Sequence, residues 1–175
     1  MPRATFSGNS NYYIDGDAAL VVQNIAGNYS DIFWRVWLAK SGGGGYWGSA
    51  NSSNRIAAVV GYPQGSQAQV LDESGFAYDF TDGANVQKFY RQGNARIYHN
   101  PDGTGGYFFV ASSRLNGLGE AIVSTGVRSL PRIPRGPRVR ANGVYRNTIA
   151  YVKVNGVWRL AIPYVRTAGA WKLSG

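Results

Sequence analysis

Short segments rich in β-branched and aromatic residues dominate the first 125 residues, and Gly, Asn, Asp and Ser separate them. No window of 11 or more residues shows the apolar period of an amphipathic helix, so almost no helix is expected. Turn-punctuated runs at this spacing predict an all-β fold, most simply a β-sandwich. Strands are expected at residues 18–23, 31–39, 46–49, 55–60, 68–71, 76–79, 86–91, 95–99, 107–112 and 120–125.

The run at residues 31–39 has the clearest alternation in the chain. Ile32, Trp34, Val36 and Leu38 alternate with a second set of residues that is also mostly apolar. A strand with apolar residues on both faces is typical of the buried middle of a sheet. We therefore expect a central strand whose second face is partly covered.

Charge is divided unevenly along the chain. Residues 1–120 contain eight Lys and Arg and all nine acids, whereas residues 121–175 contain ten Lys and Arg and no acid. The net charge of +9 therefore belongs to the C-terminal part. There is no cysteine, which excludes a disulfide framework, a thiolate metal site and a cysteine nucleophile.

Prolines mark a boundary between the two parts. Residues 129–137 contain three prolines, and proline fixes its own φ and favours extended geometry in the residue before it. The expected regions are an N-terminal polar arm at 1–16, a sandwich at 17–128, an extended linker at 129–137 and a repeat region at 138–175.

The last 38 residues contain a repeat with a period of 13. The three copies begin at Arg138, Tyr151 and Tyr164, and each has a Val, two basic residues, a Gly and an aromatic residue at matching positions. Two copies have Asn-Gly at their centre, which is the strongest short signal for a two-residue hairpin turn. The repeat therefore predicts three successive β-hairpins.

A hairpin of this length cannot bury its own faces and is marginal when isolated. The hairpins must therefore pack on one another, on the sandwich or on a neighbouring subunit. We predict that this region is an assembly element. Its removal should leave a folded sandwich, the body of the protein, that no longer assembles. The residues expected to make its contacts are Arg140, Tyr145, Tyr151, Lys153, Trp158, Tyr164, Arg166 and Trp171.

Four motifs occur in a recognisable order. They are an Asn-rich turn before a long strand at 24–34, a His-Asn-x-Asp-Gly-Thr turn at 99–104, Leu-Pro-Arg-Ile-Pro-Arg at 130–135, and the Tyr-Val-Lys…Gly-Val-Trp repeats. The first three resemble the immunoglobulin-like structural domain of long-tailed bacteriophage tail proteins. The repeats resemble the closing repeats of many phage minor tail proteins.

The resemblance covers most of residues 17–175 and implies an immunoglobulin-like β-sandwich with β-hairpin repeats. It further implies a minor tail protein, a structural part of the tail tip or fibres that assists attachment to the host surface. The implied partners are other virion tail proteins and copies of the same chain, a trimer being one option. The implied location is the phage tail, after synthesis in the host bacterial cytoplasm, with no insertion into a membrane. The resemblance brings no catalytic residue and no cofactor.

Catalytic and metal-binding interpretations find little support in the residues. His99 is the only histidine, and there is no Gly-x-Ser-x-Gly motif. Asp72 and Glu73 are adjacent, so on a strand they point to opposite faces and do not form a glycosidase pair. Two acidic stretches, at 15–17 and 79–82, do not have the spacing of a calcium loop and are more typical of turns. We expect no enzyme and no metal site.

Other binding functions remain as alternatives. Basic residues interleaved with Tyr and Trp also occur in single-strand nucleic-acid binders. Strand alternation, however, is expected to place basic and aromatic side chains on opposite faces, as on any solvated sheet, which favours assembly over nucleic acid. A carbohydrate-binding receptor module is another alternative, with Tyr46, Trp47 and Tyr62 as candidate contacts to a host glycan. A capsid decoration protein is the third.

Overall fold

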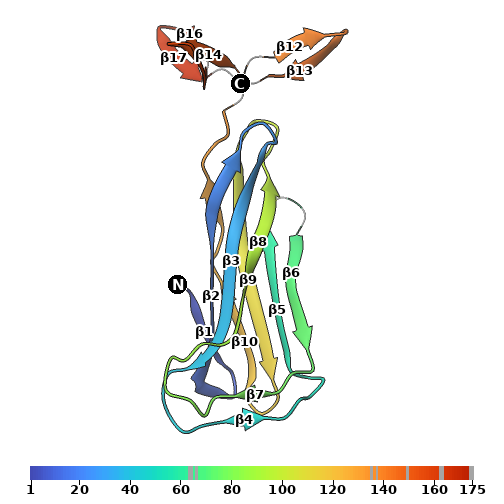
Figure 1. Ribbon diagram of the computed structural model, residues 1–175, viewed down its shortest axis with the longest axis vertical. Helices are drawn as coiled ribbons and strands as arrows, with labels where there is room; N and C mark the ends of the chain where they lie inside the picture. The colour runs from blue at the N-terminus through green and yellow to red at the C-terminus, as the bar shows by residue number, and fades with distance from the viewer. Residues whose placement is uncertain are drawn as a thin grey trace.

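Two antiparallel β-sheets pack face to face and form a β-sandwich (Figure 1). The structure is a computed structural model that describes residues 1–62, 65, 67–134, 136, 138–148, 150–161 and 164–173. These residues contain no helix, and hence none that could cross a membrane. The all-β prediction is confirmed.

Each sheet has four main strands. The first is built from β1 (Arg3–Phe6), β2 (Asn9–Asn24), β3 (Tyr29–Lys40) and β8 (Lys88–Tyr98), in that spatial order. The second is built from β10 (Gly119–Ser124), β9 (Gly105–Leu115), β5 (Arg55–Gly61) and β6 (Gln67–Ser74), also in spatial order. A short strand, β11 (Arg128–Leu130), extends the pairing of β9 beyond the end of β10.

The long strand β3 lies between β2 and β8, as its alternation predicted. Its inward-facing residues, all buried in the main core, are Ile32, Trp34, Val36 and Leu38. On the opposite face, Trp37 and Ala39 form a second buried cluster with Tyr13 of β2. The Tyr13 hydroxyl donates a hydrogen bond of 2.9 Å to Asn85 Oδ1, so the segment before β8 helps to cover this cluster. The second face is therefore covered as expected.

Residues 1–16 do not form the polar arm that the sequence suggested. The pairing of β1 with β2 starts at Arg3, and Phe6 and Ile14 are buried in the core. Gly16 lies inside β2, where an added Cβ would come within 2.9 Å of the Phe109 ring from the opposite sheet. The glycine is therefore not a turn residue; it leaves space for an aromatic side chain.

The two strands expected at 86–91 and 95–99 are one continuous strand, β8. Gly93, which lies between the two expected strands, pairs directly with Trp34 of β3. A Cβ at Gly93 would lie 2.9 Å from the Trp34 indole. An aromatic ring that covers a strand glycine compensates for its missing side chain, so the strand continues.

The first part of the expected linker belongs to the sandwich. Leu130 lies in β11, and Ile133 is fully buried. The Ile133 N–H donates to the Gly103 carbonyl at 2.9 Å, and Gln23 Nε2 donates to the Pro131 carbonyl at 2.7 Å. The extended linker predicted for 129–137 is therefore docked on the body as far as Ile133, while residues 135 and 137 lie outside the described part.

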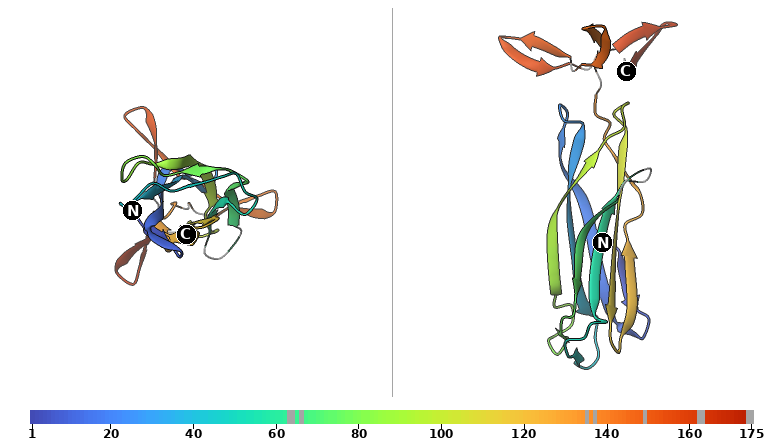
Figure 2. Two further views of the ribbon diagram at one scale, coloured as in Figure 1. Left: turned by 90° about the horizontal axis from the view of Figure 1, so that it is seen from below. Right: turned by 90° about the vertical axis from the view of Figure 1, so that its right-hand side faces the viewer.

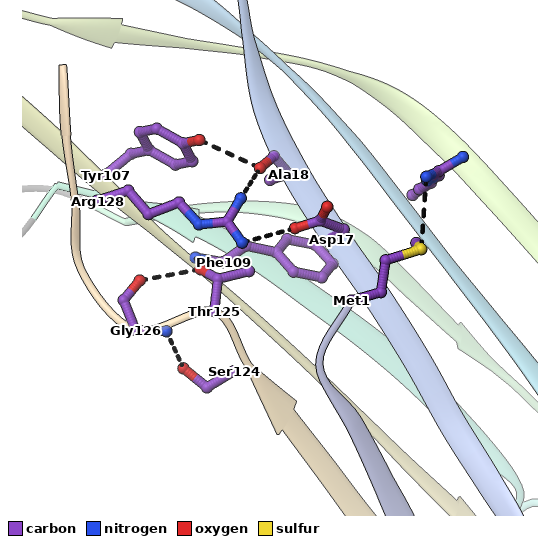
Figure 3. A network of polar contacts seen from close by, with 10 residues as sticks. Met1, Asp17, Ala18, Tyr107, Phe109, Ser124, Thr125, Gly126 and Arg128 are labelled. Atoms are coloured by element: carbon purple, nitrogen blue, oxygen red, sulfur yellow. Dashed lines mark hydrogen bonds and ion pairs between the residues drawn. The ribbon is translucent and has the colours of Figure 1, made fainter. Parts of the chain in front are cut away.

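Arg128 ties this docked segment to the first sheet (Figure 3). Its guanidinium lies 2.9 Å from Asp17 Oδ1 of β2 and donates a hydrogen bond to the Ala18 carbonyl. The Tyr107 hydroxyl donates to the same carbonyl at 3.1 Å. These contacts join the two sheets at the start of the docked segment.

Different small elements occupy the two ends of the molecule. At one end, β4 (Trp47–Gly48) pairs with β7 (Tyr78–Asp79). Three separate hairpins lie at the other end (Figure 1, Figure 2). Their strands are β12 (Arg138–Ala141) with β13 (Val144–Asn147), β14 (Tyr151–Val154) with β15 (Val157–Leu160), and β16 (Tyr164–Thr167) with β17 (Ala170–Leu173).

Candidate functional site

The three hairpins share one turn geometry, and the sequence determines it. The two central residues of each turn have positive φ: 53° and 80° in the first, 50° and 81° in the second, 51° and 83° in the third. Positive φ at both positions is the type I′ geometry that Asn-Gly favours. With a two-residue turn, the register follows directly, because the residues that flank the turn are paired.

This register brings basic and aromatic residues together. Lys153 pairs with Trp158, and its Nζ lies 6.0 Å from the centroid of the indole ring. Arg166 pairs with Trp171 in the third hairpin, and Arg140 pairs with Tyr145 in the first. The side chains of that first pair lie outside the described residues.

Directly paired residues of an antiparallel hairpin share a face. The prediction that alternation separates basic from aromatic side chains is therefore wrong for Lys153 with Trp158 and for Arg166 with Trp171. Counting outward from the Asn-Gly turn would have revealed this arrangement from the sequence. Exposed basic groups attract an anionic partner, and the aromatic rings beside them add apolar contact surface.

Both faces of the second hairpin are uncovered. On the face of Lys153, Trp158 is 65% exposed and Tyr151 is 54% exposed. On the other face, Val157 is 58% exposed and lies beside Val154. In the third hairpin, Trp171 is 67% exposed.

The expected covering of the hairpins is therefore absent from the described part of the chain, where each hairpin is a separate two-stranded sheet. Instead, one hydrogen bond closes the base of the first hairpin and another closes the base of the second. The Gly136 N–H donates to the Thr148 carbonyl at 2.8 Å, and the Ala161 N–H donates to the Ala150 carbonyl at 2.8 Å. The three hairpins point outward in three directions (Figure 2). They therefore present their faces to the surroundings rather than to one another.

The residues suggested for glycan contact are not brought together. Tyr46 is partly buried, with its ring stacked on Tyr78 at 6.1 Å and edge-on to Tyr12 at 5.9 Å. Trp47, the next residue, is 71% exposed. Tyr62 follows the far end of β5, a strand of seven residues that spans roughly 20 Å. Only Trp47 therefore remains as an exposed aromatic residue at the β4 end.

His99 is a buried structural residue in the turn that it precedes. Its Nδ1 lies 3.0 Å from the Gly103 carbonyl and its Nε2 lies 2.7 Å from Ser30 Oγ. Because a carbonyl only accepts, Nδ1 carries the proton and Nε2 accepts the serine hydroxyl. This is how a serine nucleophile and its base are arranged, but Ser30 has no exposed surface that a substrate could reach.

The two acidic stretches differ from each other. Asp15 and Asp17 lie in β2, not in a turn as predicted, and form ion pairs with Arg3 at 3.2 Å and Arg128 at 2.9 Å. Asp79 accepts the N–H of Thr81 at 2.8 Å, which is the predicted turn chemistry. The described residues contain no group of three or more His, Asp or Glu side chains that could hold a metal ion.

Exposed aromatic residues occur on the hairpins and at the β4 end, and also on β8, where Tyr98 is 64% exposed. The hairpins carry repeated pairs of basic and aromatic residues, and the β4 end carries the single exposed indole of Trp47. The hairpin region, residues 138–175, contains seven Lys and Arg and no acid. In comparisons with known proteins, no family model, no curated protein and no solved structure matches this chain.

Proposed function

We propose that this chain is a non-enzymatic structural protein of a bacteriophage tail, a minor tail protein of the tip or fibres. One observation carries the proposal: a complete sandwich is joined to three hairpins whose apolar and cationic faces are uncovered. Isolated hairpins are marginal in water, so their natural state is a contact with another molecule. The resemblance of the repeats to those of phage minor tail proteins assigns that contact to a virion.

We also propose that the sandwich is immunoglobulin-like. If β2, β3, β5, β6, β8, β9 and β10 are taken as strands A, B, C, C′, E, F and G, the sheets become A-B-E and G-F-C-C′. This partition is the one used by immunoglobulin-like sandwiches, whose connections pass repeatedly between the two sheets. The order supports the family resemblance of residues 24–34, 99–104 and 130–135.

A non-enzymatic role is supported by the state of the polar groups. The one histidine has both ring nitrogens engaged, in a site sealed from solvent. Asp72 and Glu73 form separate ion pairs with Arg55 and Arg91, each at 2.7 Å. The carboxylates of this chain therefore serve the sandwich rather than a reaction.

Incorporation into particles tests the proposed function. Phage particles are produced with the chain either complete or ending at residue 137, and purified particles are probed for the protein by immunogold labelling. Labelling of the tail by the complete chain, and its loss on truncation, is expected. The isolated truncated chain should unfold at the same temperature as the complete one, because the hairpins add no buried core. Labelling of the capsid, or normal incorporation of the truncated chain, contradicts the proposal.

A second candidate function, glycan binding, is favoured by the exposure of Trp47 at the end opposite the hairpins (Figure 1). An exposed indole provides a flat apolar surface on which a sugar ring can stack. The test is a glycan array probed with the wild-type protein and with Trp47→Ala. Tyr46→Ala is unsuitable, because Tyr46 packs against Tyr12 and Tyr78 and its loss would disturb the fold. Binding that is absent, or is equal in the two proteins, eliminates this candidate.

A further inference from the structure

Every Asp and Glu side chain, all within residues 1–120, is already engaged within the body. Seven of the nine form ion pairs with a local Lys or Arg. The other two are Asp79 and Asp102, which accept hydrogen bonds from Thr81 and Thr104. The pKa of Asp79 is lowered mainly by the Thr81 N–H, and that of Asp102 mainly by the Thr104 hydroxyl. Nearby Lys88 and Lys40 lower the pKa of Asp79 further, and Arg132 lowers that of Asp102, so each acid of the body has a cation close to it.

The net charges of the two regions have the same sign. Residues 1–137 contain eleven Lys and Arg against nine acids, a net charge of +2, and residues 138–175 contain seven and no acid, a net charge of +7. A hairpin brought near a second copy would meet either a paired surface or another cationic hairpin. Like charges at an interface oppose association, so a second copy is a poor partner for this region.

The shape of the hairpins distinguishes a protein partner from a nucleic acid. A single strand of nucleic acid stacks its bases along one aromatic platform, with cations beside the backbone. Here the second hairpin has Trp158 on one face and Val154 and Val157 on the other, all exposed. The three hairpins also point in three different directions (Figure 2). A partner that covers both faces must supply apolar as well as anionic groups, which a protein surface does.

We propose that the three hairpins dock on an acidic surface of a different protein, and not on a second copy of this chain. The inference rests on the proposed function, because it names the class of partner that the assembly element binds. Carboxylates of the partner pair with cations such as Lys153 and Arg166, and its apolar side chains cover Trp158 and Trp171. Desolvated aromatic residues next to charged pairs are the usual source of binding energy in protein interfaces.

The experiment uses the full chain and two probes, a random copolymer of glutamate and tyrosine and a single-stranded oligothymidylate. Binding is followed by fluorescence anisotropy of labelled probes. The tail variants are the double substitutions Trp158→Ala with Trp171→Ala and Lys153→Gln with Arg166→Gln. Matched controls are Trp47→Ala, which removes an equally exposed indole from the other end, and Arg55→Gln, which removes a cation from the body.

We expect the copolymer to bind, and each tail double variant to weaken that binding by more than about tenfold while the controls leave it unchanged. Oligothymidylate should bind more weakly, without dependence on the two tryptophans. Sedimentation velocity should give the complete chain and the chain ending at residue 137 the same oligomeric state. Three results would each overturn the inference: self-association that requires the hairpins, tighter binding of oligothymidylate than of the copolymer, or copolymer binding that is absent or independent of the tail variants.

Failure of this inference is distinguishable from failure of the proposed function. Incorporation into phage tails without copolymer binding would leave the virion role intact and remove only the acidic partner. Copolymer binding by a protein that is absent from tails would do the reverse.

Discussion

The body and the hairpins are both built from antiparallel strands that carry tryptophan, but the exposure of the tryptophan side chains differs between them. Trp34 in β3 and Trp158 in β15 both lie in antiparallel strands, yet the first is 5% exposed and the second 65% exposed. Trp34 covers Gly93 and stacks on Phe109 of the other sheet at 6.5 Å, whereas the ring contact described for Trp158 is with its own hairpin partner, Lys153. Local pairing therefore forms a strand, and only a second layer buries it.

The largest expected difference in the free energy of unfolding comes from replacing each of these two tryptophans by alanine. Trp34→Ala should lower the free energy of unfolding by about 3–5 kcal/mol, because it leaves a large cavity between the sheets. Trp158→Ala should change it by less than about 0.5 kcal/mol, because no core contact is lost. Urea unfolding followed by circular dichroism measures both values. A comparable loss in Trp158→Ala would mean that the hairpin packs on the body after all.

The predictable features of the fold are those with a local cause. The Asn-Gly turns indicate the hairpins, since positive φ at both central residues allows few other structures. The alternation of residues 31–39 indicates a central strand, because both of its faces are apolar. In each case a few residues that are neighbours in the sequence are enough to explain why the element forms.

The features that were missed depend on residues distant in the sequence. Gly16 and Gly93 look like turn residues until Phe109 and Trp34 are placed over them. Ile133 lies between two prolines and after a break in the pattern, and only its burial shows that the segment is docked. In the candidate site, Tyr62 is near Trp47 in the chain, but the length of β5 separates them.

Buried polar groups give a second, smaller contrast between the regions. Ser30→Ala removes the hydroxyl that donates to His99 Nε2 and leaves that nitrogen without its partner inside the body. The free energy of unfolding should fall by about 1–3 kcal/mol, the usual cost of an unsatisfied buried group. Thr167→Ala, on the exposed third hairpin, is the control and should have no measurable effect in the same urea titration. Equal stability of Ser30→Ala and wild type would show that the contact adds nothing to the body.

The pH dependence of stability gives a further test of the body, through the buried residue Tyr78. Burial, followed by the nearby Tyr46, raises the pKa of Tyr78 to about 12. An unfolded tyrosine titrates near pH 10, so between pH 10 and pH 12 the unfolded state loses this proton before the folded state does. The stability that this neutral hydroxyl provides is complete below pH 10 and is lost as the pH approaches 12.

Tyr78→Phe removes this effect together with the hydrogen bond to the Asn116 carbonyl. The wild type should therefore be the more stable protein at pH 8, and its advantage over Tyr78→Phe should shrink steadily between pH 10 and pH 12. Thermal unfolding across this range provides the measurement, with Tyr151→Phe on the second hairpin as a control that should run parallel to the wild type. A constant difference between the wild type and Tyr78→Phe would refute the burial effect.

The smallest effect concerns the turn of the third hairpin alone. Ala168 has a φ of +51°, where the first two repeats have Asn142 and Asn155. A left-handed conformation costs an ordinary L-residue about 1 kcal/mol, and asparagine tolerates it better. Ala168→Asn should thus stabilise the third hairpin by about 0.5–1 kcal/mol, seen as stronger NMR cross-strand contacts between Arg166 and Trp171. Asn155→Ala should weaken the second hairpin by a similar amount. Neither substitution should move the urea midpoint of the body, because the hairpins fold apart from the core; a shift in that midpoint would show that both regions unfold as one cooperative unit.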